Sequence, residues 1–193
     1  MPLFTRDDIS RSSIPVSGSG ASLTRGTVSF WDRFQKKIDT HFREMDLTGE
    51  SSVHFYSDGA WNMHDLLYYF LKRQGASKVY LTTWAISEIA MRQLCNFMKD
   101  GLITELFALF DYRNTSRKPA ELAFIEQNAT RIKLAKCHAK VTVIDCVSMP
   151  VTIVSSANYT RNPRLEAGVI AFSREVADFH KDWILKEICD AQA

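Results

Sequence analysis

The stretch CHAKVTVID at residues 137–145 says more about the fold than any other part of the chain. Its run of β-branched and apolar residues, VTVI, is typical of a β-strand. Successive side chains of a strand point to opposite faces, so His138 and Lys140 are expected on one face and Asp145 on the other. Because Asp145 points away from the basic pair, we expect it to be structural, as the partner in a buried ion pair.

A second polar stretch, VSSAN at residues 154–158, follows on the next expected strand. By the same alternation, Ser156 and Asn158 share a face if the extended backbone continues as far as Asn158. If the two strands are neighbours, an imidazole, an ammonium, a hydroxyl and a carboxamide converge on one point. This set suits a tetrahedral anion, because Lys and Asn donate hydrogen bonds to its oxygens, Ser can assist, and His can attack phosphorus or move protons.

Taken together, the two stretches resemble the phospholipase D superfamily, whose signature reads H-x-K, four residues, D, and a little later G-S-x-N. His138, Lys140 and Asp145 match the first part of the signature at the correct spacing. Ser156 and Asn158 match the Ser and Asn of the second part. The resemblance implies a phospholipase D-like fold with one HKD domain.

Three neighbouring features depart from the resemblance or extend it. Ser155 stands where the family usually has Gly, and its β-carbon would alter the approach of a substrate phosphate. The segment between Asp145 and Ser155 is longer than the usual hairpin. Glu166, which precedes AGVI at residues 167–170, looks like the family glutamate that precedes a strand and orients the histidine.

The family mechanism, as the resemblance implies it, needs two histidines. One attacks phosphorus to give a phosphohistidine, and the other protonates the leaving oxygen. This chain has one copy of the motif, because none of its other histidines is followed two residues later by Lys. It therefore resembles the half-size bacterial endonucleases of the superfamily, in which a two-fold homodimer brings two motifs to one site. The implied site needs no metal and no cofactor.

The resemblance also implies a role for each of the other site residues. Glu166 would bond one ring nitrogen of His138, fix its tautomer and stabilise the cation. Lys140 and Asn158 would hold the phosphoryl oxygens as negative charge builds, and Ser156 would assist them.

Basic residues surround the two motifs in the sequence. Candidate substrate-binding residues follow the third expected strand and the S-x-N motif: Arg113, Arg117, Lys118, Arg161 and Arg164. A basic rim around a phosphodiester site fits a nucleic-acid backbone, although any one of these residues is equally compatible with a solvated surface. Trp61 and Trp84 follow strand ends, where either ring would stack on a base or, more commonly, pack in the core.

Short β-rich runs alternate with helical runs from residue 50 onward. Expected strands cover residues 52–56, 78–84, 103–109, 131–135, 140–145, 151–155 and 168–172. Expected helices cover residues 61–74, 87–99, 119–128 and 175–188; Ser87 is a plausible N-cap, and Gly75 and Gly101 close the first two. The pattern predicts an α/β fold with a mixed β-sheet sandwiched between helices.

The N-terminal part of the chain has a different character. Ser and Gly dominate residues 10–26, so residues 1–26 are expected to form a flexible tail. Over residues 27–47 apolar side chains recur at helical spacing, at Trp31, Phe34, Ile38, Phe42 and Met45. This spacing predicts an amphipathic helix, which either packs on the chain's own core or docks on another protein or a second protomer. The catalytic domain is then expected to cover residues 50–193.

Composition limits the kinds of partner and compartment. With 24 Lys and Arg against 22 Asp and Glu, the formal charge is +2, which excludes a histone-like polycationic mode of nucleic-acid binding. The longest apolar run, residues 66–71, is too short to cross a bilayer, so no stable membrane insertion is expected. The first ten residues do not read as a secretory signal and the four cysteines lack CxxC spacing, so the expected compartment is the cytoplasm.

The sequence therefore predicts an enzyme, a metal-independent phosphodiesterase that acts on nucleic acid with little sequence preference. Two alternatives remain open. Phospholipid hydrolysis would use the same phosphorus chemistry, but it would be expected to need an apolar funnel or an interfacial helix near the site. A catalytically silent nucleic-acid-binding module would account for the serine at position 155.

Overall fold

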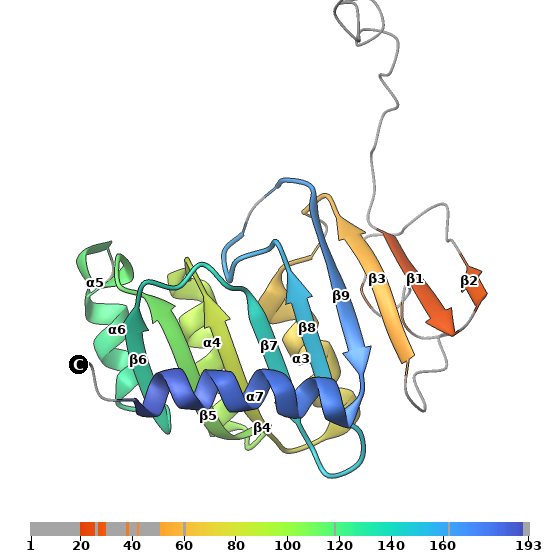
Figure 1. Ribbon diagram of the computed structural model, residues 1–193. Helices are drawn as coiled ribbons and strands as arrows, with labels where there is room; N and C mark the ends of the chain where they lie inside the picture. The colour runs from red at the N-terminus through yellow and green to blue at the C-terminus, as the bar shows by residue number, and fades with distance from the viewer. Residues whose placement is uncertain are drawn as a thin grey trace, which may run out of the picture.

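A mixed β-sheet runs through the chain (Figure 1). Its strands bury apolar side chains on both faces. The computed structural model describes residues 20–25, 27–29, 38, 42, 51–59, 61–117, 119–161 and 163–190. The strands are β1 (Gly20–Arg25), β2 (Thr27–Ser29), β3 (Ser51–Ser57), β4 (Ser77–Thr83), β5 (Ile103–Asp111), β6 (Arg131–Ala135), β7 (Val141–Asp145), β8 (Val151–Ser155) and β9 (Glu166–Phe172). Their order in the sheet is β2-β1-β3-β9-β8-β7-β4-β5-β6.

The direction of the strands follows from their connections. β4, β5 and β6 run parallel to one another, and helices α4 (Glu88–Lys99), α5 (Asn114–Arg117) and α6 (Pro119–Glu126) supply the crossovers that parallel neighbours need. The remaining neighbours pair antiparallel, including β7 with β8 and β8 with β9. The predicted α/β class with a mixed sheet is confirmed.

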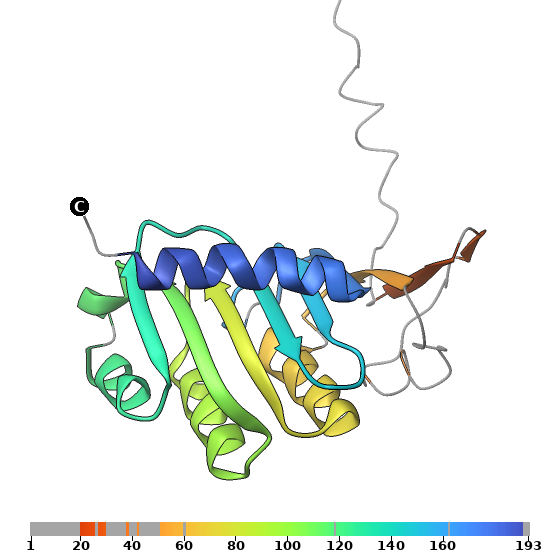
Figure 2. The same cartoon turned by 60° about the horizontal axis from the view of Figure 1, so that its bottom comes forward.

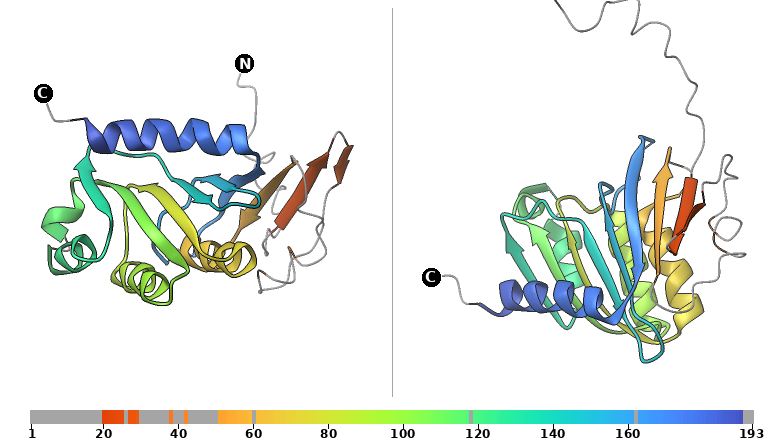
Figure 3. Two further views of the ribbon diagram at one scale, coloured as in Figure 1. Left: turned by 90° about the horizontal axis from the view of Figure 1, so that it is seen from below. Right: turned by 45° about the vertical axis from the view of Figure 1, so that its right-hand side comes forward.

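Helices cover both faces of the sheet (Figures 2 and 3). Helix α3 (Met63–Gln74), α4 and α6 lie on one face, and the long helix α7 (Arg174–Cys189) crosses the other. The predicted sandwich is therefore confirmed for the described residues. None of the described helices combines the length and the apolar character that crossing a membrane requires.

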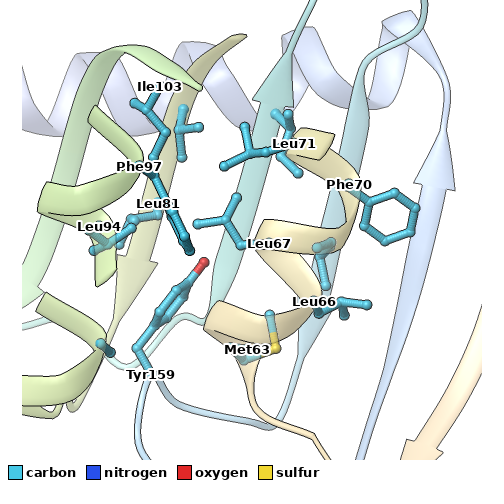
Figure 4. Packing of buried hydrophobic residues seen from close by; sticks show 14 of the residues in the cluster. Met63, Leu66, Leu67, Phe70, Leu71, Leu81, Leu94, Phe97, Ile103 and Tyr159 are labelled. Carbon is cyan, nitrogen blue, oxygen red and sulfur yellow. The ribbon is translucent and has the colours of Figure 1, made fainter. Parts of the chain in front are cut away.

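The larger core lies between the sheet and helices α3 and α4 (Figure 4). Leu66, Leu67 and Phe70 of α3 pack there with Leu81 of β4 and Leu94 of α4, and all five are fully buried. Burying one such side chain stabilises a fold by about 1.5–3 kcal/mol. This layer therefore holds α3 and α4 firmly beneath the strand ends at which the polar motifs lie.

The smaller core lies under α7 on the opposite face. Tyr80 of β4 and Val143 of β7 pack there against Ala177, Ile184 and Ile188 of the helix. Because Ile144 faces the larger core, β7 is buried on both sides, as its uninterrupted apolar run predicts.

The expected helix ends are also found. The Ser87 hydroxyl accepts a hydrogen bond from the Ala90 N–H at 3.2 Å and so caps α4. Gly75 ends α3 with φ +83° and Gly101 follows α4 with φ +71°, a backbone region that favours glycine.

Three expectations need correction. Part of the expected flexible tail, residues 20–25, forms β1 and pairs with β3, and residues 27–29 form β2 where a helix was expected to begin. Ile38 and Phe42 are helical as predicted, and the rest of the expected N-terminal helix lies outside the described residues. The segment after β5, expected to be a loop, contains the short helix α5, because Asn114 bonds the Asp111 carbonyl and starts a turn.

Candidate functional site

The polar motifs meet at one end of the strands, where β4, β5 and β8 end and β7 and β9 begin (Figure 1). We call this end of the sheet the motif edge, or simply the edge. His138 and Lys140 precede β7, Ser156 and Asn158 follow β8, and Glu166 opens β9. The strand that was expected to carry His138 starts only at Val141, so the basic pair stands on an extended segment beyond the sheet.

The two basic residues of the first motif contact each other. The Lys140 ammonium donates to the His138 carbonyl at 2.7 Å and lies 3.2 Å from His138 Nδ1. The His138 ring is exposed and Lys140 is half-buried. Partial burial lowers the pKa of Lys140, while smaller contributions from Cys137 and then from Glu166 raise it. Keeping Lys140 charged at this partly buried position therefore costs some desolvation free energy.

Asp145 lies at the other end of β7 and faces α7. Its carboxylate accepts from Arg174 Nη1 at 2.5 Å and lies 3.6 Å from Lys181 Nζ. The side chain is 18% exposed. The predicted separation of Asp145 from the basic pair is confirmed. Its ion pair is found as well, but the pair is not buried as expected, because Arg174 is 45% exposed. The purely structural role of Asp145 stays a prediction.

Ser156 and Glu166 form a pair that the sequence did not predict. The Ser156 hydroxyl donates to Glu166 Oε2 and accepts from the Ala167 N–H at 3.0 Å. A hydroxyl has one proton to donate, so Ser156 in this arrangement holds Glu166 rather than a phosphoryl oxygen. Glu166 was expected to bond His138, which stays a prediction; among the described residues, Glu166 Oε2 accepts a hydrogen bond from Ser156.

Asn158 is fixed by its carboxamide oxygen. The Ala85 N–H donates to Oδ1 at 3.2 Å, and the Thr83 hydroxyl lies 3.3 Å from the same atom. The next residue, Tyr159, is buried in the larger core, where its hydroxyl bonds Thr142 at 2.7 Å and burial raises its pKa (Figure 4). With the oxygen used in this way, the NH₂ group is the part of Asn158 that can donate to a ligand.

Ser155 is turned into the fold. Its hydroxyl accepts from the Ala157 N–H at 3.1 Å and lies 3.5 Å from Met63 Sδ. Across the strand pair it faces Gly168, where an added β-carbon would stand only 2.6 Å from the Ser155 Cβ. Gly168 therefore leaves the room that a serine at position 155 occupies.

A buried carboxylate supports the segment that leads to His138. Asp111, 1% exposed, accepts from the Cys137 N–H at 3.3 Å through Oδ2 and from Arg113 Nε at 2.8 Å through Oδ1. Burial alone would raise the Asp111 pKa, but the Arg113 hydrogen bond and charge, helped by the Cys137 N–H, lower it below its usual value. Asp111 thus stays charged and fixes the residue before His138.

The candidate substrate-binding residues fall into three groups. Arg113 lies beside the site with its guanidinium over the Trp84 ring. Arg161 and Arg164 are exposed between β8 and β9. The side chain of Arg117 and all of Lys118 lie outside what the structure describes.

No protein-family model matches the chain, and no curated protein matches it at a significant level. Its function is therefore inferred from its own residues and their geometry.

Sequence reasoning missed Asp111 and Thr83 as supports of the site. Both are buried polar residues at the ends of apolar strands, at the edge where the motifs lie. A polar residue that closes an apolar run is the signal by which they could have been found. Within the described ranges, no three His, Cys, Asp or Glu side chains gather as metal ligands would.

Proposed function

We propose that the protein is a metal-independent phosphodiesterase with a phospholipase D-like fold, and that it cleaves nucleic acid. The observation that carries this proposal is that the residues of one motif lie at opposite ends of β7. His138 and Lys140 precede the start of β7 and Asn158 follows the end of the neighbouring β8, while Asp145 is paired with cations of α7. Such an edge offers a nucleophile and hydrogen-bond donors to a phosphodiester.

In the proposed reaction, a ring nitrogen of neutral His138 attacks phosphorus, and the bond from phosphorus to the leaving oxygen breaks. The leaving oxygen takes a proton from a second, protonated histidine. Water then attacks the phosphohistidine, gives its proton back to that histidine, and frees His138. Lys140 and the NH₂ group of Asn158 stabilise the negative charge on the phosphoryl oxygens in both steps.

The second histidine is His138 of a second copy in a two-fold homodimer. A partly exposed face of the sheet beside the site supports this part of the proposal. Val154 is 39% exposed and pairs across the strands with Val169. The exposed His54, which also pairs with Val169, and Tyr56, 37% exposed, belong to the same face of the sheet. A second copy would bury this surface while it brings its own histidine to the site.

Glu166 acts in this scheme through charge. Its negative charge raises the pKa of Lys140, and the Ser156 hydroxyl donates a hydrogen bond to its carboxylate. Glu166 thereby favours the protonated form of Lys140, which binds a phosphate.

Nucleic acid is favoured over lipid as the substrate because of the residues around the edge. Arg113, Arg161 and Arg164 all lie near the strand ends that carry the motifs, and several cations along one edge suit a polyanion with regularly spaced phosphates. The four cysteines are free, which is consistent with action in a reducing cytoplasm.

The experiment is to incubate the purified protein in excess chelator with plasmid, single-stranded DNA, RNA and phosphatidylcholine vesicles. The proposal expects cleavage of at least one nucleic acid with the chelator present, and loss of cleavage in His138→Ala. Release of choline or phosphatidate alone would make it a lipid hydrolase. Nucleic-acid binding without cleavage would make it a silent module, and loss of cleavage on chelation would contradict the histidine chemistry.

A further inference from the structure

An unbroken line of aromatic and basic side chains leads away from His138. The Trp84 ring lies 5.6 Å from the His138 ring, between centroids. The Arg113 guanidinium carbon lies 5.1 Å from the centre of the Trp84 ring and 5.7 Å from the centre of the Tyr112 ring. We call Trp84, Tyr112 and Arg113 the flanking strip.

Arg113 is held in one orientation within the strip. Its Nε donates to the buried carboxylate of Asp111 at 2.8 Å, which fixes the plane of the guanidinium. In the part of the chain that the structure describes, neither terminal nitrogen of Arg113 donates to another residue. The side chain is 47% exposed, so these two nitrogens are available to an acceptor from outside.

Tyr112 gives the strip an aromatic surface in contact with solvent. It is 49% exposed, far more than the tyrosines of the core, and it follows β5 at the same sheet edge as the motifs. The Tyr112 N–H is bonded to the Ala135 carbonyl at 2.9 Å, which ties the backbone of Tyr112 to the end of β6. An exposed ring on an anchored backbone is a stacking surface that needs little ordering when a ligand binds.

We propose that the flanking strip is a subsite for the nucleotide next to the scissile phosphate of a single-stranded nucleic acid. The terminal nitrogens of Arg113 bind the phosphate of this nucleotide, and the unpaired base of the same nucleotide stacks on the Tyr112 ring. The inference depends on the proposed function, because His138 marks the scissile position.

The chemistry of the strip selects a single strand for two reasons. In a duplex the faces of the bases are covered by their neighbours, whereas an unpaired base can stack on an aromatic ring. A phospholipid has a phosphodiester but carries no aromatic base that would match Tyr112. Stacking accepts every base, so the strip predicts little sequence preference.

The test measures binding with cleavage switched off. In a His138→Ala background, the affinity for short labelled single-stranded DNA and RNA is measured by fluorescence anisotropy. Tyr112→Leu is expected to weaken binding about tenfold, as loss of one stacked base does. The matched control is Tyr68→Leu on α3, since Tyr68 is 44% exposed and lines a groove between α3 and α4. This variant is expected to bind the nucleic acid with unchanged affinity.

A cycle of changes in protein and ligand separates stacking from damage to the fold. Replacing the flanking nucleotide by an abasic one should weaken binding to the protein that keeps Tyr112. The same replacement should have little further effect on the affinity of the Tyr112→Leu variant. Arg113→Gln should lower the slope of log affinity against log salt by about one phosphate contact.

The outcomes distinguish this inference from the proposed function. If the wild-type protein cleaves nucleic acid but Tyr112→Leu binds it as Tyr68→Leu does, the flanking strip is not a subsite and the proposed function stands. Equal affinity for duplex and single strand would also overturn the inference. Binding that depends on Tyr112, with no hydrolysis by the wild-type protein, would overturn the proposed function and leave the flanking strip as a binding site for a single strand.

Discussion

The charged residues at the two ends of strand β7 differ in how their charge is balanced. At the C-terminal end of β7, the Asp145 charge is balanced within the chain by Arg174 and Lys181. At the N-terminal end, Lys140 is partly desolvated, and its hydrogen bond goes to the uncharged His138 carbonyl. Charge that is balanced internally serves the fold, whereas a charge held at a cost is available to an anionic ligand. Variants at either end of the strand can break this contrast or sharpen it.

Replacing Lys140 should have the largest effect. Lys140→Met is expected to lower turnover about 10²- to 10³-fold, because it removes a cation from the developing phosphoryl charge. Its melting temperature should equal or exceed that of the wild type, because the desolvated charge is gone. A variant that unfolds earlier yet keeps its turnover would place Lys140 among the structural residues.

Glu166→Gln should act through Lys140. A glutamine can still accept from Ser156, so the geometry is kept while the charge is lost. Because the Glu166 charge raises the Lys140 pKa, its loss should move the alkaline limb of the pH–rate profile to lower pH and so lower turnover most at alkaline pH. Initial rates measured across the pH range give the answer.

The control for Glu166→Gln is Ser156→Ala, which removes one hydrogen bond to the carboxylate without removing its charge. It should change the profile less. An alkaline limb that stays in place in Glu166→Gln would show that the carboxylate acts on another group.

Asp145→Asn should affect stability more than turnover. Asp145 is 18% exposed and Arg174 45% exposed, so the loss of one charge from the pair is expected to cost about 1 kcal/mol, which lowers the melting temperature by about 2–4 °C for a chain of this size. Asp182→Asn, at an exposed position of α7, is the matched control and should change neither quantity. Abolished turnover with an unchanged melting temperature would mean that Asp145 takes part in the reaction.

How far the sequence could predict this contrast depends on the range of each interaction. Strand alternation predicted that Asp145 and Lys140 face opposite ways, since it needs only the local backbone. Ser87 as a helix cap and Gly75 as a helix end are local too, and both were predicted correctly.

The contacts that the sequence did not predict all join distant segments. Ser156 holds Glu166 because two strand ends meet in space, and Asp111 reaches the Cys137 N–H across a whole β-α-β crossover. The pairing of β1 with β3 is of the same kind, because a Ser- and Gly-rich segment has no apolar period that predicts a strand. Such contacts depend on the assembled sheet, so spacing alone could not reveal them.

The smallest expected effect concerns pH and separates stability from activity. Burial lowers the pKa of His64, against an opposing contribution from Asp65, so the folded chain protonates His64 less readily than the unfolded chain does. Below about pH 6.5 the unfolded chain takes up a proton that the folded chain does not, so the free energy of unfolding should fall as the pH drops. Melting temperatures at pH 7.5 and 5.5 measure this, and His64→Gln should reduce the difference.

His138 is the residue on which the whole account depends, and its covalent state during turnover can be measured directly. The wild-type protein is mixed with a nucleic-acid substrate in excess chelator, quenched at alkaline pH, where a phosphohistidine survives, and mapped by peptide mass spectrometry. The account predicts a phosphate-linked nucleotide adduct on the peptide that carries His138, absent from His138→Ala. Turnover with no adduct at His138, or with an adduct on a different residue, would contradict it.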